Sequence, residues 1–249
     1  MQVVILCGGK GTRIRGVDDS VPKPMIPIGE KPILIHIMEF YANYGHLEFV
    51  LCLGYLGSVI RTYFGSLGET VGNATVQFTL PSGADVRVRL IDTGQETMTG
   101  ARIRMIQTLV KEDDFLLTYG DGLSDVDLDK LLSFHNSHAG AMTLTAVHPP
   151  SRFGEVEIDD NGLATSFNEK PQVSVGLISG GYFVCRQKIF DFLSTDQSLV
   201  FEAEPMRQMV REKQLFAYSH QGFWQCMDTY RDWEYLNQLE QRGESPWRL

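Results

Sequence analysis

Apolar and polar positions alternate along the chain in blocks of two kinds. Short, continuous apolar runs have the length of buried strands. They lie at Val3–Leu6, Phe49–Leu53, Phe115–Tyr119, Met142–Val147 and Phe183–Cys185. Stretches in which apolar residues recur every three or four positions predict helices. They lie at Pro32–Gly45, Val59–Phe64, Ala101–Val110, Leu128–His138 and Tyr230–Arg242.

Two weaker patterns predict further strands. Val86–Ile91 alternates apolar residues with arginine, as expected of a strand that is exposed on one face. Leu163–Phe167 also has strand character, whereas the end of the chain, Ser245–Leu249, is expected to be irregular.

The order of these elements indicates the fold class. Strands that alternate with helices favour an α/β fold, Rossmann-like, in which a mainly parallel mixed sheet carries helices on both faces. No repeat or linker interrupts the pattern, so we expect a single domain over residues 1–249. Ligands of such sheets bind beyond the carboxyl ends of the strands, which directs attention to the loops after Leu6, Leu53 and Tyr119.

Composition narrows the class of protein. The formal net charge of −9 argues against a nucleic-acid partner, because binding to phosphate backbones depends on lysine and arginine. The four cysteines lie far apart and form no paired motif, so we expect free thiols in a reducing compartment. The apolar run at the N-terminus is too short for a signal peptide or a membrane span. We therefore expect a cytoplasmic protein with no membrane partner.

A glycine-rich loop follows the first strand directly. Glycines at 8, 9 and 11 let the backbone approach a ligand and direct several N–H groups into one concavity, which suits phosphate oxygens. Arg13 adds a forked cation. The spacing fits neither a P-loop nor a dinucleotide fingerprint, which would need glycine where Ile14 stands. The alternative is a turn that only reverses the chain.

A second cation follows about ten residues later. Lys23 stands between Pro22 and Pro24, and because proline restricts both itself and the residue before it, the lysine is presented by stiff backbone. An ordinary exposed loop is the alternative.

These two motifs together resemble the signature of sugar-1-phosphate nucleotidylyltransferases. The resemblance extends over nearly the whole chain and is strongest to the branch that transfers a cytidylyl group to glucose 1-phosphate. It rests on Gly29–Leu34, Asp92–Gly94, Met98–Gly100, Thr118–Gly122, Phe223–Gln225, Met227–Thr229 and Pro246–Trp247. It implies a fold of glycosyltransferase-A type, with a nucleotide-binding half at about 1–125 and a sugar-binding half at about 126–249. It also implies a homo-oligomer, up to a hexamer.

Two carboxylates are candidates for holding Mg²⁺. Asp121 ends an apolar strand and stands between two glycines, where it would lie open to a ligand. A turn-forming aspartate is the alternative. Asp228 stands just before the last helix, so it is either a second metal ligand, as the resemblance implies, or the N-cap of that helix. Asp127 and Asp129 are expected to be solvated or to cap another helix.

The resemblance implies a role for further residues. The nucleotide, CTP, would be bound by Leu6, Cys7, Gly8, Gly9, Lys10, Gly11, Thr12, Arg13, Lys23, Thr97, Met98, Thr99, Gly100, Arg102 and Gly120. The sugar phosphate would be bound by Tyr119, Gly154, Glu169, Lys170, Gly180 and Gly181. Arg13, Lys23 and Asp121 would be the catalytic residues.

The expected reaction joins CTP and glucose 1-phosphate to give CDP-glucose and pyrophosphate, by an in-line attack assisted by Mg²⁺. Three alternatives stay open. The first is a uridylyl- or thymidylyltransferase. The second is a glycosyltransferase, for which Asp125-Val126-Asp127 would be the metal motif. The third is a sensor without catalytic activity.

Overall fold

A nine-stranded mixed sheet forms the centre of the protein. The computed structural model describes residues 1–11, 14, 20–72, 74–149, 155–158, 163–168 and 176–248. In spatial order the strands are β14 (Leu215–His220), β10 (Met142–Val147), β13 (Ile178–Arg186), β8 (Asp114–Tyr119), β1 (Gln2–Cys7), β4 (Glu48–Leu53), β7 (Asp85–Asp92), β6 (Thr75–Thr79) and β5 (Glu69–Val71). Only β13 and β6 run against the other strands of this sheet. The expected fold class is therefore confirmed.

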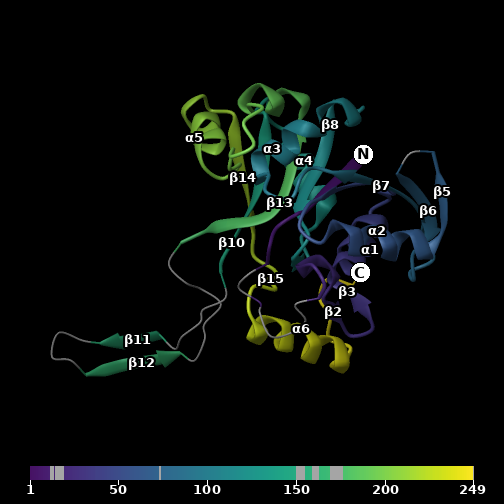
Figure 1. The fold of residues 1–249 in the computed structure, drawn as a ribbon. Helices are drawn as coiled ribbons and strands as arrows, with labels where there is room; N and C mark the ends of the chain where they lie inside the picture. Colours follow the sequence, from purple (N-terminus) through teal and green to yellow (C-terminus); the bar gives the residue numbers. More distant parts are fainter. Residues whose placement is uncertain are drawn as a thin grey trace.

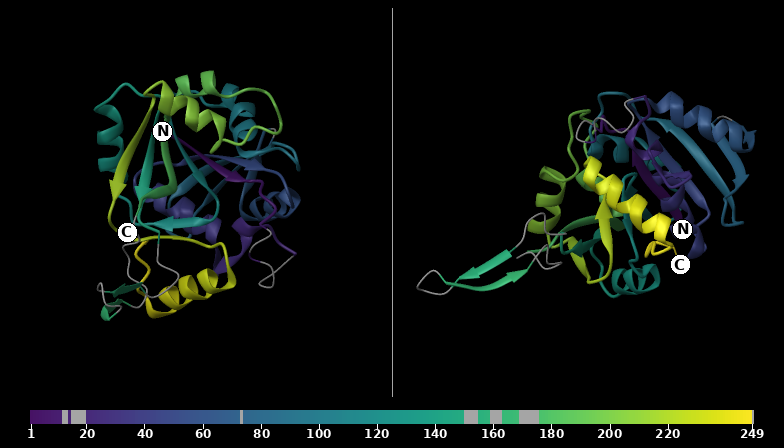
Figure 2. Two further views of the ribbon diagram at one scale, coloured as in Figure 1. Left: turned by 90° about the vertical axis from the view of Figure 1, so that its left-hand side faces the viewer. Right: turned by 90° about the horizontal axis from the view of Figure 1, so that it is seen from below.

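Helices cover both faces of the sheet, as Figures 1 and 2 show. They are α1 (Ile33–Asn43), α2 (Gly57–Leu67), α3 (Thr99–Met105), α4 (Leu128–Asn136), α5 (Glu204–Arg211) and α6 (Tyr230–Arg242). Short 3₁₀ turns are η2 (Lys23–Met25), η3 (Gln107–Leu109) and η4 (Gln187–Phe192).

Two apolar cores follow from the alternation of side chains along each strand. In β1, Val3 and Ile5 belong to the core beneath α1, α2, α4 and α6, whereas Val4 and Leu6 belong to the core beneath α3 and α5. The strand is buried on both sides, which explains why its sequence is a continuous apolar run.

Three two-stranded ribbons accompany the sheet. They are β2 (Pro27–Ile28) with β3 (Lys31–Pro32), β9 (Gly122–Ser124) with β15 (Trp224–Cys226), and β11 (Glu155–Ile158) with β12 (Ala164–Asn168). The β11–β12 hairpin projects away from the sheet in both figures.

Several expected elements differ from the structure. The helix expected over Ala101–Val110 is wrong in its bounds, because α3 begins at Thr99 and ends at Met105, and η3 follows. β5, β6, β14 and β15 did not appear among the expected strands, and neither did α5 among the helices. These elements are short or only half-buried, so their hydrophobic periodicity is weak. The C-terminal tail carries a buried side chain, Trp247, whose indole N–H donates to His36.

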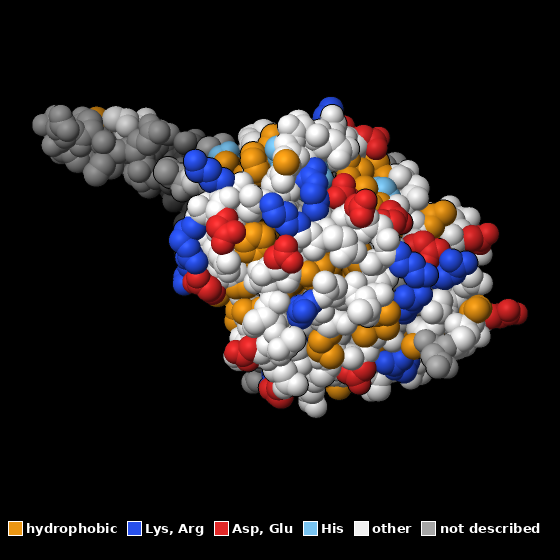
Figure 3. Space-filling model, turned by 90° about the horizontal axis from the view of Figure 1, so that it is seen from above, with side chains coloured by type: hydrophobic (Ala, Val, Ile, Leu, Met, Phe, Trp, Pro, Cys, Tyr) orange, Lys and Arg blue, Asp and Glu red, His pale blue; other side chains and the backbone are white. Residues whose placement is uncertain are grey.

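The surface and the cysteines add two observations. The face in Figure 3 carries interspersed acidic and basic side chains. All four cysteines lie in the described residues and are free thiols, as expected. Within the same residues, no helix combines the length and apolar character needed to cross a membrane.

Candidate active site

The site lies where the chain order of the sheet reverses. β1 lies between β4 and β8, and both neighbours run parallel to it. The chain passes from β1 to β4 and later returns to β8 on the other side, so the loops after β1 and β8 diverge at one edge of the sheet. Open α/β sheets bind ligands in such a crevice.

Gly120 joins the loop after β8 to the end of β1. Its N–H donates to Leu6 O at 3.1 Å. A Cβ at this position would lie 2.9 Å from Cγ of Pro24 and 3.3 Å from Sγ of Cys7. Only glycine therefore lets the segment around Pro24 approach the end of β8 so closely.

Lys23 lies in the turn η2, which the flanking prolines help to form. The N–H of Met25 donates to Pro22 O at 2.7 Å and closes the turn. The Lys23 ammonium donates to Oδ2 of Asp121 at 2.6 Å and also to Oδ1 of Asp228. Burial by itself lowers the pKa of Lys23, but the two carboxylates more than offset this effect and raise the pKa. Lys23 is therefore a stable cation held by two acids.

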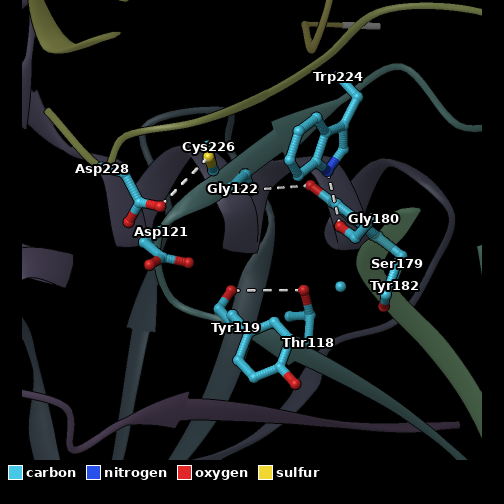
Figure 4. Close-up of a pocket in the computed structure, with 11 residues that line it drawn as sticks. Thr118, Tyr119, Asp121, Gly122, Ser179, Gly180, Tyr182, Trp224, Cys226 and Asp228 are labelled. Atoms are coloured by element: carbon cyan, nitrogen blue, oxygen red, sulfur yellow. Dashed lines mark hydrogen bonds between the residues drawn. The ribbon is translucent and has the colours of Figure 1, made fainter. Parts of the chain in front are cut away.

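The β9–β15 ribbon brings the two acids together. Gly122 pairs with Cys226, and Met227 N donates to Asp121 O at 2.8 Å. Asp121 and Asp228 consequently flank the same end of the ribbon, although 107 positions separate them in sequence (228 minus 121). Figure 4 shows both side chains directed toward the same space.

Asp228 does not cap α6. Thr229 is the N-cap, and its Oγ1 accepts from Asp232 N at 3.3 Å. The Asp232 carboxylate accepts in return from Thr229 N at 2.8 Å, which completes a capping box. The N-cap interpretation of Asp228 is therefore wrong, and its carboxylate is directed to Lys23 instead.

Arg102 lies beneath the glycine loop. Its side chain is buried, and the guanidinium donates to Leu53 O at 2.9 Å, to Thr93 Oγ1 at 2.6 Å and to Gly8 O at 3.0 Å. A Cβ on Gly8 would lie 2.2 Å from the guanidinium, so the glycine is needed for this approach. Arg102 thus ties the loop after β1 to the loop after β4.

The other residues expected around the nucleotide differ in exposure and in their partners. Lys10 is exposed and forms an ion pair with Glu96 at 2.8 Å. Thr97 is buried, whereas Met98 is 43% exposed. Thr99 donates to Glu202 Oε2 at 2.8 Å.

A cavity of about 270 Å³ opens beside the two acids (Figure 4). Its lining comprises Thr118, Tyr119, Asp121, Gly122, Ser179, Gly180, Gly181, Tyr182, Trp224, Cys226 and Asp228. The indole N–H of Trp224 donates to Gly180 O at 2.7 Å and closes one wall. Gly181 has a φ of +77°, and a Cβ there would lie 2.6 Å from Cδ2 of Tyr119. Gly181 therefore allows the Tyr119 ring to form the opposite wall.

Comparison with known proteins decides the family. The family model described as "Nucleotidyl transferase" matches residues 2–238. The chain belongs to this family. It is 40% identical over 256 residues to the Bacillus subtilis (strain 168) protein named "Probable glucose-1-phosphate cytidylyltransferase", with all of both chains covered (100% and 100%). It is also 40% identical over 257 residues to the glucose-1-phosphate cytidylyltransferase of Salmonella typhi, which covers 100% of this chain and 99% of that relative.

The same fold is present in solved structures. UDP-glucose pyrophosphorylase complexed with UDP-glucose superimposes with a TM-score of 0.72, covering 97% of this chain and 98% of the other. At 16% identity this likeness shows the fold alone. The two chains therefore share one fold.

Some of the residues predicted for the site of this nucleotidyl transferase lie together in the structure. Lys23, Asp121 and Asp228 meet directly, and Tyr119, Gly180 and Gly181 line the adjoining cavity. Five predicted residues lie outside the described residues, namely Thr12, Arg13, Gly154, Glu169 and Lys170. Their roles stay predictions.

Some lining residues had no predicted role. Trp224 and Cys226 reach the cavity because β15 pairs with β9. Phe223-Trp224-Gln225 contributed to the family resemblance, which was the one signal pointing to this strand. Glu202 gave no signal, since a glutamate is ordinarily a surface residue.

Proposed function

We propose that the protein transfers a cytidylyl group from CTP to glucose 1-phosphate, which yields CDP-glucose and releases pyrophosphate. The observation that carries this proposal is the convergence of Lys23 with Asp121 and Asp228 beside a polar cavity. The full-length similarity to glucose-1-phosphate cytidylyltransferases supports the choice of substrates.

The chemistry requires positioning and charge neutralisation. An oxygen of glucose 1-phosphate attacks the α-phosphorus of CTP in line, and pyrophosphate leaves from the opposite side. The attacking phosphate is already anionic, so no general base is needed. Cations and backbone N–H groups must instead bring two anions together and stabilise the charge that develops.

Lys23 is the described cation best placed for this role. Its ammonium lies between the end of β8 and the start of α6, and its raised pKa keeps it charged at neutral pH. The glycine loop after β1, held from below by Arg102, would direct its amides to the phosphates of CTP. Arg13 is proposed to add a second catalytic cation.

The two acids fit a magnesium site. They already share one cation, which shows that their oxygens converge on a single point. Among the residues that the structure describes, no three His, Cys, Asp or Glu side chains could hold a metal by themselves. Phosphate oxygens and water would complete the coordination, as Mg²⁺ prefers. Mg²⁺ held by Asp121 and Asp228 would supply positive charge to the phosphates.

The cavity suits the sugar phosphate. Tyr119, Gly180 and Gly181 would contact the glucose ring, and Glu169, Lys170 and Gly154 are proposed to complete this subsite. The remaining predicted nucleotide contacts, including Thr97, Met98 and Gly100, are proposed for the cytidine side.

The glycosyltransferase alternative is disfavoured by the surroundings of its motif. Oδ1 of Asp125 lies 2.9 Å from Nε2 of His220, and Asp127 is the N-cap of α4, where its side chain accepts from Lys130 N. Both acids are thus engaged away from the cavity. A uridylyl- or thymidylyltransferase remains the second candidate, because the same centre would serve any of these nucleotides.

A substrate panel tests the proposal. The purified protein is incubated with CTP, UTP or dTTP and with several sugar 1-phosphates, and pyrophosphate release is measured with Mg²⁺ or with EDTA. We expect the highest kcat/KM for CTP with glucose 1-phosphate and loss of turnover in EDTA. A higher kcat/KM for UTP or dTTP would replace the nucleotide assignment, and no release with any pair would overturn the proposed reaction.

Two further predictions concern the state of the protein in the cell. A homo-oligomer, up to a hexamer, would be seen by light scattering coupled to size-exclusion chromatography. A cytoplasmic location would be seen by fractionation of the source cells.

A further inference from the structure

Glu202 links the two sides of the site. One carboxylate oxygen, Oε2, accepts from Oγ1 of Thr99 at 2.8 Å. The other, Oε1, accepts from the hydroxyl of Tyr119. Thr99 begins α3 on the nucleotide side, and Tyr119 ends β8 in the wall of the cavity. A single side chain therefore bridges groups that belong to different subsites.

The segment that carries Glu202 is itself attached to the nucleotide-side loop. Met98 N donates to Gln197 O at 2.9 Å, and Gly100 N donates to Leu199 O at 2.9 Å. Phe201 N donates to Oγ1 of Thr99 at 2.9 Å. Residues 197–202 thus lie alongside residues 98–100 and support them. The Glu202 carboxylate is the part of this segment that reaches Tyr119.

Contacts with Gly181, Phe183 and Glu202 bear on the position of the Tyr119 ring. The ring lies against Gly181, which leaves no side chain to restrain it there. It contacts Phe183 edge-on, with ring centroids 5.8 Å apart. Its hydroxyl is held by Glu202. Tyr119 precedes Asp121 by two residues, and both line the same cavity (Figure 4).

We propose that Glu202 is a positioning residue that orders the nucleotide-side loop at Thr99 and the sugar-side wall at Tyr119 together. This proposal rests on the proposed function for the identity of the two substrates. It assigns no contact between Glu202 and either substrate.

Replacement of Glu202 distinguishes a role in both subsites from a local effect on one of them. In Glu202→Ala, both hydroxyl groups lose their acceptor, and hydrogen bonds to charged groups are the stronger class. We expect KM to rise about 10-fold for CTP and about 10-fold for glucose 1-phosphate, with kcat reduced less. Tyr119→Phe should raise mainly the KM for glucose 1-phosphate, and Thr99→Val mainly the KM for CTP.

Combination with Glu202→Ala tests the bridge itself. If Glu202 acts through Tyr119 and Thr99, the double variants should show non-additive effects, since each second substitution removes an interaction already lost. Glu202→Gln retains an oxygen acceptor for Tyr119 and should recover most of the KM for glucose 1-phosphate.

A matched control lies two residues away. Glu204 is exposed, at the start of α5, and forms an ion pair with Arg211 at 2.5 Å. Glu204→Ala makes the same truncation as Glu202→Ala without touching Thr99 or Tyr119, so both KM values should stay within about twofold of the parent.

Hydrogen exchange tests the proposal without substrate turnover. In Glu202→Ala, amide exchange should accelerate in peptides covering residues 97–101 and 118–120 relative to the parent and to Glu204→Ala. Unchanged exchange in both peptides, or a KM effect on one substrate only, would overturn the bridging role. Failure of the parent to use any substrate pair would overturn the proposed reaction. The bridging role of Glu202 would then be judged from the exchange result by itself.

Discussion

Two cations lie at the carboxyl edge of the sheet, and their surroundings are opposite. Lys23 donates to two carboxylates beside the cavity. Arg102 donates to neutral acceptors only, two carbonyl groups and a threonine hydroxyl, and its side chain is buried. Burial lowers the pKa of Arg102, whereas the carboxylates raise the pKa of Lys23.

This difference in partners indicates that Lys23 is available for chemistry, whereas Arg102 holds the backbone in place. Neutral carbonyl oxygens need a donor when they are buried, and a guanidinium satisfies several at once. Carboxylates that are paired with an ammonium retain further lone pairs. A metal ion that binds phosphates can be coordinated by these lone pairs. We therefore expect Lys23 and its acids to set the rate, and Arg102 to set the stability of the loops.

The largest effect is expected from Asp121→Asn. The substitution keeps the shape of the side chain but removes one of the two charges that hold Lys23 and would hold Mg²⁺. By analogy with the loss of one group that stabilises a transition state, kcat should fall about 10²–10³-fold. The measurement is steady-state pyrophosphate release at saturating substrates.

Its control is the exposed Asp129→Asn in the first turn of α4. This variant should retain parental kcat. Near-parental kcat in Asp121→Asn, with the thermal midpoint unchanged, would reject the role of the acid pair.

A smaller effect, on stability, is expected from Arg102→Met. The carbonyl groups of Leu53 and Gly8 would lose their buried donor, and unsatisfied buried groups are costly. The free energy of unfolding in urea should fall by about 2–3 kcal/mol. Arg211→Met, which breaks an exposed ion pair, should lower it by less than about 1 kcal/mol. An unfolding free energy equal to the parent's would show that Arg102 does not support these loops.

The contact between Arg102 and the glycine loop can also be tested by substitution of Gly8. A methyl group on Gly8 would overlap the guanidinium at 2.2 Å, whereas nothing lies within 4 Å of the same position on Gly9. Gly8→Ala should lower the free energy of unfolding by about 1–2 kcal/mol, and Gly9→Ala should lower it far less. Equal losses in the two variants would mean that the loop is not held from below by Arg102.

A further effect, confined to acid pH, extends the comparison to a buried histidine. His135 is bonded to Oγ1 of Thr143, and its Nε2 lies 4.0 Å from Asp114, so it too lacks a close acidic partner. Burial, with Arg186 and His138 nearby, lowers the pKa of His135 to about 3. The unfolded chain takes up this proton below about pH 6.5, and the folded protein does not.

Stability should therefore fall as pH drops from about 6.5 toward about 3, by at most about 1.4 kcal/mol per pH unit from this residue. His135→Gln should show a shallower decline in urea unfolding over this range. Parallel declines in both proteins would exclude His135 as the group responsible.

The sequence alone predicted a large part of the fold. Continuous apolar runs located β1, β4, β8 and β10, and helical spacing located α1, α4 and α6. The edge strands β5 and β14 were not predicted, because a strand buried on one side or neither has little apolar signal. Asp121 and Lys23 could be selected as candidates because glycine and proline around them restrict the backbone.

What the tertiary structure alone decided is which polar groups meet. Thr229 caps α6 and leaves the Asp228 carboxylate directed at Lys23, because the β9–β15 ribbon sets the register between distant segments. Arg102 is a support beneath the loops, and Glu202 is a bridge across the site, because strand order places their partners within reach. Local sequence determines backbone preference and burial pattern, whereas pairing between distant segments depends on the packing of the whole sheet.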